Sequence, residues 1–341
     1  MFKQLSQLVL MACLSAGLLT GCSFSEKQEV QSLFGYSMGT SYSIKLVAGL
    51  NESRNLQLGI EGVLSNINSR MSTYLPNSDL SKFTEAPLDQ ALPVDPKTSI
   101  VVAKALEIAK TTDGFFDPTV APLVDLWGFG PTPRNNEVPD EQQILAILDR
   151  VGYPAVSVDL NSHNLKRSEI RELDLSAIAK GYAVDEVANY IESKGFSDYL
   201  VEVGGEMRFS GQKPNGSAWR IAIEKPVPGE REPYRIIDVS DAAIATSGDY
   251  RNYFEIDGRR FSHSINPRTG YPIEHDLASV TVVMDSCMEA DAYATAFSVM
   301  GKEAALELAE RLNIAVFIIF KKEDGFDSIQ SSQFTRKFGA L

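Results

Sequence analysis

One short segment, residues 261–270 (FSHSINPRTG), concentrates side chains that can do chemistry. His263 stands between two serines, is one of only 3 histidines in the chain, and is followed by Asn-Pro and Thr-Gly pairs. Such pairs favour turns, and turns place polar side chains on loops where they can reach a ligand. The segment therefore predicts a short strand that ends in a functional loop, with a merely polar hairpin end as the alternative.

A second pattern lies in residues 288–297 (MEADAYATAF), where Asp291 and Thr295 are four residues apart. On a helix this spacing puts both side chains on one face, one turn apart. A carboxylate and a hydroxyl are hard oxygen ligands of the kind that Mg²⁺ takes together with water and phosphate. The alternative is structural, because Glu289 and Asp291 would also suit a first helical turn and Thr295 could simply be packed.

Residues 173–185 (LDLSAIAKGYAVD) predict a helix start with little side-chain cover, since most of the early residues are small. Exposed backbone N–H groups at such a start form an anion site, and Lys180 could add a positive charge for phosphate. The alternative is a helix that is capped by Asp174 or Ser176 and packed closely at Gly181.

An aromatic pair offers a place for a flat ring. Phe115 and Phe116 stand beside Asp117, so they could hold a heterocycle whose nitrogen donates to the carboxylate, or they could fill a core. Two strand ends rich in glycine or hydroxyl groups, residues 203–206 (VGGE) and 245–249 (ATSGD), suit close approach to a ligand or a plain turn.

Helical and strand patterns alternate along the chain and must position these groups. Apolar spacing predicts helices over 55–71, 96–114, 141–148, 175–192, 288–300 and 302–312. Strands are expected on both sides of a break at 38–40 and over 199–203, 219–223, 235–239, 252–256, 259–265, 278–284 and 314–320, with a loop over 115–133. Hairpins mixed with helix–strand crossovers predict an α/β (mixed α+β) fold, with mixed sheets, packed helices and two closely associated subdomains.

The chain begins with a pattern for export. Residues 1–21 combine Lys3 with an apolar run over 8–19 that is too short to span a bilayer, which predicts a signal peptide. Leu-Thr-Gly before Cys22 resembles the lipobox of bacterial lipoproteins, and several acyl chains on Cys22 would give stable membrane anchoring. We therefore expect a tether over 22–32 and the folded domain over 33–341; the alternative is an ordinary signal peptide with an incidental cysteine.

Cysteine content and charge limit the possible partners. Cys13 leaves with the signal peptide and Cys22 carries lipid, so Cys287 remains alone and a packed core must replace disulfides. The formal charge of −13 becomes −14 once Lys3 is removed, which argues against nucleic acid as a partner. An anionic ligand would need a helix terminus, a few local cations or a metal ion to neutralise it.

Common nucleotide and hydrolase signatures are absent from the sequence. It contains no P-loop, no G-x-G-x-x-G after a strand and no G-x-S-x-G elbow. The histidines and cysteines are too widely separated for a zinc site.

Taken in order, several segments resemble one known family, the ApbE family of bacterial FAD:protein FMN transferases. These segments are MGTSYSIKL, MSTYLPNSDLSKF, DGFFDPTVAPLVDLWGFG, LDLSAIAKGYAVD, YLVEVGGE, IATSGDY, FSHSINPRTGYP and MEADAYATAF. Each is weak alone, but their order and spacing cover essentially the whole mature chain, and the lipobox fits as well.

The resemblance implies a fold particular to the family, a bound FAD and a Mg²⁺ ion. The implied FAD-binding residues are Met38, Tyr74, Phe115, Phe116, Asp117, Asp174, Lys180 and Ile265. The implied Mg²⁺ site consists of the Ala177 carbonyl, Asp291 and Thr295, with Ala294 adjoining. The family is not uniform at the position of Lys180, so the role of that residue is open.

The resemblance further implies transfer of FMN from FAD to a threonine or serine of exported flavoproteins, such as subunits of sodium-translocating NADH:quinone reductase, with release of AMP. Mg²⁺ would offset the diphosphate charge in an acidic protein. His263 and Asp291 are the candidate catalytic residues, with His263 as the general base; Asp174 or Asp291 could take the proton instead. The expected location is the bacterial cell envelope, lipid-anchored and facing the periplasm.

Two other functions would use the same site. Water in place of the acceptor hydroxyl would make the protein a Mg²⁺-dependent FAD pyrophosphatase that gives FMN and AMP. A flavin-storage lipoprotein without catalytic activity would need no metal ion at the diphosphate.

Overall fold

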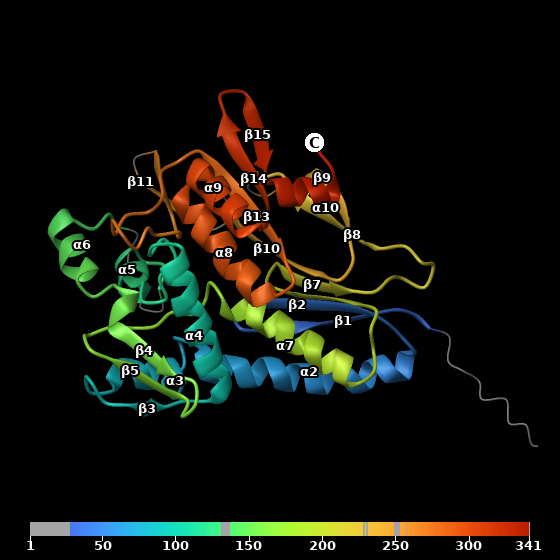
Figure 1. Cartoon of the computed structure of the whole chain (residues 1–341), viewed down its shortest axis with the longest axis horizontal. Helices are drawn as coiled ribbons and strands as arrows, with labels where there is room; N and C mark the ends of the chain where they lie inside the picture. The colour runs from blue at the N-terminus through green and yellow to red at the C-terminus, as the bar shows by residue number, and fades with distance from the viewer. Residues whose placement is uncertain are drawn as a thin grey trace, which may run out of the picture.

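The computed structural model describes residues 28–130, 137–227, 229, 231–248, 253–256 and 258–340. The predicted signal peptide, Cys22 and most of the tether lie outside these residues. Helices and sheets are combined throughout, which confirms the predicted α/β (mixed α+β) class (Figure 1). Every strand pairing among the described residues is antiparallel, so the fold is the α+β form of that class. The division into two subdomains stays a prediction.

One large sheet organises the described part of the chain. Its strands lie in the order β1-β2-β6-β7-β10-β13-β14-β15. Their bounds are β1 Glu29–Ser37, β2 Thr40–Ala48, β6 Tyr199–Val203, β7 Glu206–Ser210, β10 Ala242–Gly248, β13 Leu277–Met284, β14 Ala315–Lys322 and β15 Gly325–Gln330.

The two faces of this sheet are buried by different partners, because side chains alternate along each strand. In β10, Ala243 and Ala245 belong to the main apolar core on the helix side. Ala242 and Ile244 belong to a second core beneath a two-stranded ribbon. The ribbon consists of β8 Trp219–Glu224 and β9 Pro233–Val239.

Helices α2, α7 and α8 cover the first face. Figure 1 shows α2 and α7 running side by side below β1 and β2, and α8 rising from the end of α7 along β10 and β13. The helices are α2 Leu50–Met71, α3 Asp79–Glu85, α4 Pro96–Thr111, α5 Ala121–Leu126, α6 Glu141–Leu148, α7 Ala179–Ser193, α8 Cys287–Met300, α9 Lys302–Leu312 and α10 Ser332–Phe338, with a 3₁₀ turn η1 at Tyr153–Ala155.

Smaller sheets flank this body. They are β3 Leu92–Pro93, β5 Asn164–Arg167 and β4 Val156–Asp159 in one sheet, and β11 Tyr253–Ile256 with β12 Arg259–Ser262 in another. A third apolar cluster joins α5 and α6 to β11 and β12. In it, the Trp127 indole donates to the Gly270 carbonyl oxygen at 2.8 Å, which fixes the turn that follows β12.

The predicted helices all exist, but several boundaries and assignments were wrong. Helix α2 begins at Leu50 and not at residue 55. The tether predicted over 22–32 overlaps β1, which begins at Glu29 because that residue pairs with Ala48 of β2. The helix predicted from residue 175 begins at Ala179, because buried Ile178 adopts an extended φ of −148° and interrupts the helical path. The loop predicted over 115–133 contains α5, since Pro122 lies in the first turn, where proline is tolerated, and Leu123 is fully buried. Strands β3, β4, β5, β7 and β15 and helices α3 and α10 were not predicted.

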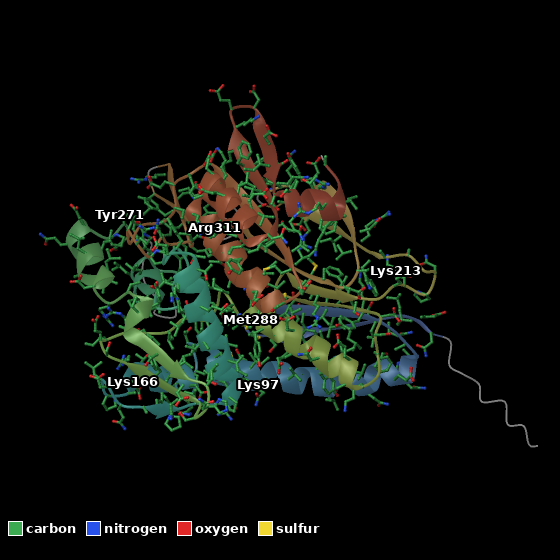
Figure 2. All side chains as sticks on the ribbon, viewed as in Figure 1. Lys97, Lys166, Lys213, Tyr271, Met288 and Arg311 are labelled. Atoms are coloured by element: carbon green, nitrogen blue, oxygen red, sulfur yellow. The ribbon has the colours of Figure 1, made fainter. Side chains whose placement is uncertain are left out.

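The labelled basic side chains and the thiol of Cys287 lie in different environments. Figure 2 shows the labelled basic side chains Lys97, Lys166, Lys213 and Arg311 on separate segments of the chain. Cys287 is fully buried at the start of α8, and this burial raises the pKa of its thiol well above the usual value. Among the described residues, none of the helices has the length and apolar character needed to cross a membrane.

Candidate active site

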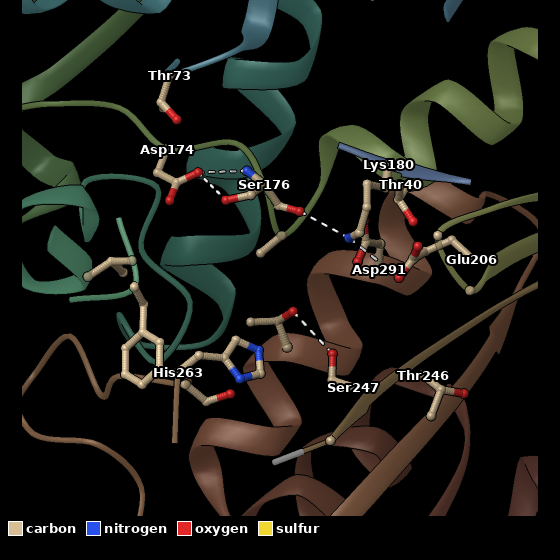
Figure 3. A pocket seen from close by; sticks show the side chains of 18 of the residues that line it. Thr40, Thr73, Asp174, Ser176, Lys180, Glu206, Thr246, Ser247, His263 and Asp291 are labelled. Atoms are coloured by element: carbon tan, nitrogen blue, oxygen red, sulfur yellow. Dashed lines mark hydrogen bonds and ion pairs between the residues drawn. The ribbon is translucent and has the colours of Figure 1, made fainter. Parts of the chain in front are cut away.

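A cleft of about 1330 Å³ opens where the ends of β2 and β10 and the β6–β7 turn meet α7 and α8 (Figure 3). Its lining includes eight of the predicted site residues: Tyr74, Asp174, Ala177, Lys180, His263, Ile265, Asp291 and Thr295. Segments far apart in the sequence thus contribute to one concave surface, which is where small ligands usually bind.

The contact between α7 and α8 brings Lys180 and Asp291 together. The backbone N–H of Gly181, in the first turn of α7, donates to Asp291 Oδ2 at 3.0 Å. A Cβ atom at residue 181 would lie 2.2 Å from the Cys287 carbonyl oxygen, so only glycine permits this approach. The close packing proposed for Gly181 from the sequence is therefore present, and it positions a carboxylate of the cleft.

Lys180 lies between two buried carboxylates. Its Nζ is 3.4 Å from Glu206 Oε1 and 3.6 Å from Asp291 Oδ2, and it donates to the Ser176 carbonyl oxygen at 3.1 Å. Asp291 is 3 % exposed and Glu206 is 5 % exposed. One positive charge therefore faces two negative charges where water screens them poorly.

Burial controls the protonation of this cluster. It raises the pKa of Glu206 to about 8; the charge of Lys180 opposes this rise and that of Asp291 adds to it. Burial also raises the pKa of Asp291 against the opposing effect of Lys180. Burial alone would lower the pKa of Lys180, but the charges of Asp291 and Glu206 outweigh it and raise that pKa. With both carboxylates ionised, the cluster carries one net negative charge, which a divalent cation can offset.

The oxygen donors around this cluster suit a hard divalent cation. Asp291 and Thr295 are one turn apart on α8, as the sequence predicted, and the Thr295 hydroxyl lies 3.2 Å from that of Ser247 at the end of β10. Asp291 lies beyond the first turn of α8, so a favourable helix dipole does not explain its position.

Glu206 Oε2 is buried and has no hydrogen-bond partner among the described residues. The same part of the chain contains no cluster of three or more acidic, histidine or cysteine ligands. Few protein ligands supplemented by water and phosphate are typical of Mg²⁺ sites. The oxygen donors of Asp291 and Thr295 in the cleft fit Mg²⁺, whose predicted ligands are Asp291, Thr295 and the Ala177 carbonyl.

Asp174 closes the turn before α7. Its Oδ1 accepts hydrogen bonds from the Ser176 backbone N–H, at 2.8 Å, and from the Ser176 hydroxyl. Its own N–H donates to the Pro118 carbonyl oxygen at 2.8 Å. Asp174 thus caps this turn and not the helix, and it borders the cleft beside Ser176 and Ala177.

His263 faces the cleft from the loop that follows β12. In Figure 3 its imidazole lies below Asp174 and Lys180, which border the cleft from above. The ring meets Phe129 edge-on, with centroids 6.3 Å apart. The loop is held by its Asn-Pro and Thr-Gly turns, in which the Asn266 carbonyl oxygen accepts the Gly270 N–H at 2.8 Å. The predicted loop is therefore present, and its functional role stays a prediction.

The aromatic pair and its carboxylate lie outside the cleft lining. Phe116 is buried in the main core, and Arg268 stacks over the Phe115 ring at 4.7 Å. Asp117 is buried and accepts hydrogen bonds from the Thr119 backbone N–H and hydroxyl, at 2.8 and 2.6 Å. Core packing, which the sequence left open as an alternative, is what Phe116 and Asp117 show; their role toward FAD rests on the resemblance.

Two further predicted residues are not part of the lining either. Met38 has a positive φ of 51° in the β1–β2 turn, at the predicted break, and packs partly against the main core. Ala294 is 1 % exposed and belongs to the same core, directly before Thr295. Their proximity to a ligand stays a prediction.

Sequence reasoning did not identify Glu206 as a site residue, although it noted the Gly-Gly-Glu strand end. The sequence signal that could have identified Glu206 is the pair of glycines before it. In the structure Gly204 and Gly205 have φ of 66° and 108°, values that only glycine adopts readily. That turn reverses the chain between β6 and β7 and places Glu206 beside Lys180.

Fold and cleft together define an α+β protein whose ligand site combines buried carboxylates, hydroxyl groups and one histidine. Solved structures with this fold include the following two. The flavinyl transferase ApbE of Pseudomonas stutzeri superposes with a TM-score of 0.85 at 38% identity, over 92% of this chain and 98% of that one. The flavin transferase ApbE of Vibrio cholerae gives 0.85 at 41% identity, over 91% of this chain and 100% of that one.

The sequence relatives agree. The FAD:protein FMN transferase of Vibrio cholerae is 44% identical over 327 residues, which is 95% of this chain and 97% of the relative. That of Haemophilus influenzae is 39% identical over 321 residues, 91% of this chain and 92% of the relative. The ApbE family model matches residues 38–318, and the chain belongs to the ApbE family. It is accordingly an enzyme of the transferase class, and the resemblance seen in the sequence is confirmed.

Proposed function

We propose that the protein transfers FMN from FAD to a threonine or serine hydroxyl of exported flavoproteins. The new bond is a phosphoester between the acceptor oxygen and the FMN phosphorus, and the diphosphate bond to AMP breaks. AMP leaves with the bonding electron pair, so atoms and charge balance once the hydroxyl proton is removed. The observation that carries the proposal is the meeting of Asp291, Thr295, Lys180 and His263 in one cleft.

Each of these side chains has a separate role in the proposed reaction. His263, on the loop across the cleft from Lys180, accepts the proton of the attacking hydroxyl. Asp291, Thr295 and the Ala177 carbonyl would hold Mg²⁺, which when bound neutralises the diphosphate of FAD. Lys180 adds a positive charge beside them. Tyr74, 68 % exposed at the rim, offers a ring on which a flavin or adenine can stack.

The direct test combines the purified protein with FAD, MgCl₂ and an exported acceptor subunit. Covalent labelling is followed by in-gel flavin fluorescence after denaturation, and AMP is measured in parallel. Labelled acceptor with equimolar AMP supports the transferase. AMP without labelled acceptor would identify an FAD pyrophosphatase, and tight FAD binding without AMP would identify a storage protein.

Asp291→Ala tests the metal site within this function. We expect at least about a 100-fold loss of transfer with a much smaller loss of FAD affinity, because the carboxylate acts on the diphosphate and not on the rings. Glu289→Ala is the matched control: Glu289 lies on the same helix but pairs with Lys104, at 2.8 Å, away from the cleft lining. Undiminished transfer in metal-chelated buffer would contradict the Mg²⁺ assignment.

We also propose that residues 1–21 direct export and that acylated Cys22 anchors the protein in the cell envelope, facing the periplasm, where exported acceptors lie. The sequence pattern at Leu-Thr-Gly-Cys22 supports this location. Cys22→Ala should move the protein from the membrane fraction to the soluble fraction, as measured by immunoblot. A variant that stays membrane-bound after a salt wash would refute lipid anchoring.

A further inference from the structure

Glu206 is a buried carboxylate that the reaction described above does not use. It follows the glycine turn between β6 and β7, is 5 % exposed and lines the cleft. Its Oε1 lies 3.4 Å from Lys180 Nζ, whereas its Oε2 is buried without a hydrogen-bond partner among the described residues. Buried polar atoms without partners are rare and costly, so this carboxylate calls for a physical explanation.

The geometry around Lys180 supplies one. The ammonium group lies at 3.4 Å from Glu206 and 3.6 Å from Asp291, and its shortest contact is the Ser176 carbonyl oxygen at 3.1 Å. These carboxylate distances exceed those of a closed charge-assisted hydrogen bond, about 2.7–2.9 Å. Lys180 therefore interacts with both carboxylates and forms a short hydrogen bond with neither.

This sharing matters for Asp291, which already accepts the Gly181 N–H through Oδ2. Among the described residues no hydrogen bond uses its Oδ1. A lysine that paired fully with Asp291 would cancel the charge that a cation needs. Glu206 draws the ammonium toward the β6–β7 turn, and the three side chains together retain one net negative charge when both carboxylates are ionised.

We propose that Glu206 is a positioning residue that holds Lys180 off Asp291, so that the Asp291 carboxylate stays available to a divalent cation. The inference rests on the proposed function only in that it takes Asp291 to be a Mg²⁺ ligand. Glu206 itself need not touch the cation or the flavin. Its effect is electrostatic and acts through Lys180.

The experiment measures Mg²⁺ binding to the full-length protein without flavin, by calorimetric titration and by the Mg²⁺-dependent rise of the unfolding temperature at pH 8.5. Glu206→Gln keeps shape but removes charge, so Lys180 should close onto Asp291 and weaken Mg²⁺ binding by about tenfold or more. Glu206→Asp, which keeps the charge, should recover part of this loss. Glu202→Gln is the matched control from the same hairpin, because Glu202 accepts the Gly205 N–H at 2.8 Å. We expect it to bind Mg²⁺ within about twofold of wild type.

A double variant separates positioning from simple loss of structure. Removing both partners in Lys180→Met/Glu206→Gln leaves Asp291 unpaired and should restore Mg²⁺ affinity toward that of wild type. Wild-type affinity in Glu206→Gln, or a double variant no better than Glu206→Gln, would overturn the inference. Because no flavin is present, the readout is independent of turnover. The expected pattern in a protein that transfers no FMN would refute the proposed function alone.

Discussion

The contact between α7 and α8 at Gly181 gives the sharpest prediction about how the cleft is built. In Gly181→Ala the new Cβ would lie 2.2 Å from the Cys287 carbonyl oxygen, 2.6 Å from its carbon and 2.8 Å from Asp291 Cβ. Ordinary contacts start near 3.4 Å, and two of the three atoms are backbone, so the helices themselves must separate.

Opposing contributions set the size of the effect. Alanine in a helix interior gains about 1 kcal/mol over glycine. Overpacking costs about 1–3 kcal/mol, and weakening the hydrogen bond from residue 181 to buried Asp291 costs about 1.5–3 kcal/mol more. We expect a net loss of about 1.5–5 kcal/mol in the free energy of unfolding, together with a loss of transfer, because Asp291 moves with α8.

Urea unfolding followed by circular dichroism measures the free energy, and the flavin fluorescence assay measures transfer. Gly62→Ala is the matched control: Gly62 also lies within a helix, α2, and a Cβ there would meet nothing within 4 Å. We expect it to stabilise the protein by about 0.5–1 kcal/mol with transfer unchanged. If Gly181→Ala is as stable and active as Gly62→Ala, the reasoning about this contact is wrong.

Two further predictions concern protons. His263→Gln should lower the rate of transfer by about 100-fold or more with little change in FAD affinity, if His263 accepts the hydroxyl proton; an equal loss of affinity would assign it to binding. Burial raises the pKa of Glu206 to about 8 from 4.5 in the unfolded chain. Its contribution to the stability of the metal-free protein is therefore complete below about pH 4.5 and is lost as the pH rises through about 8. Urea unfolding at pH 5, 6.5 and 8.5 should show this decline in wild type and a flatter profile in Glu206→Gln; parallel profiles would contradict it.

Local patterns in the sequence were enough for much of the fold. Helix α4 begins at Pro96, as predicted, and there the Asp95 carboxylate caps it by accepting the Lys97 N–H. The four-residue spacing of Asp291 and Thr295 required only that α8 be a helix. Such features depend on a few neighbouring residues, so spacing and caps encode them directly.

Long-range packing decided the rest. Helix α7 begins at Ala179, later than predicted, because the buried residue Ile178 has a non-helical backbone, which no helical pattern reveals. From the sequence, Phe116 and Asp117 could either bind a flat heterocycle or pack in the core. In the structure both side chains are buried. The sequence pattern could not distinguish these two interpretations, because a buried aromatic residue and one that contacts a ligand have the same neighbours in sequence.

The sequence by itself determined which chemical groups the protein has. They are the carboxylate of Asp291, the hydroxyl of Thr295, the imidazole of His263 and the ammonium group of Lys180. Only the tertiary structure decided that Lys180 is shared between Asp291 and Glu206, whose positions are far apart along the chain. The physical reason is that electrostatic balance in a buried site depends on distances of a few ångströms between separate elements. Those distances are fixed by packing contacts such as Gly181 against Cys287, and local sequence carries no record of them.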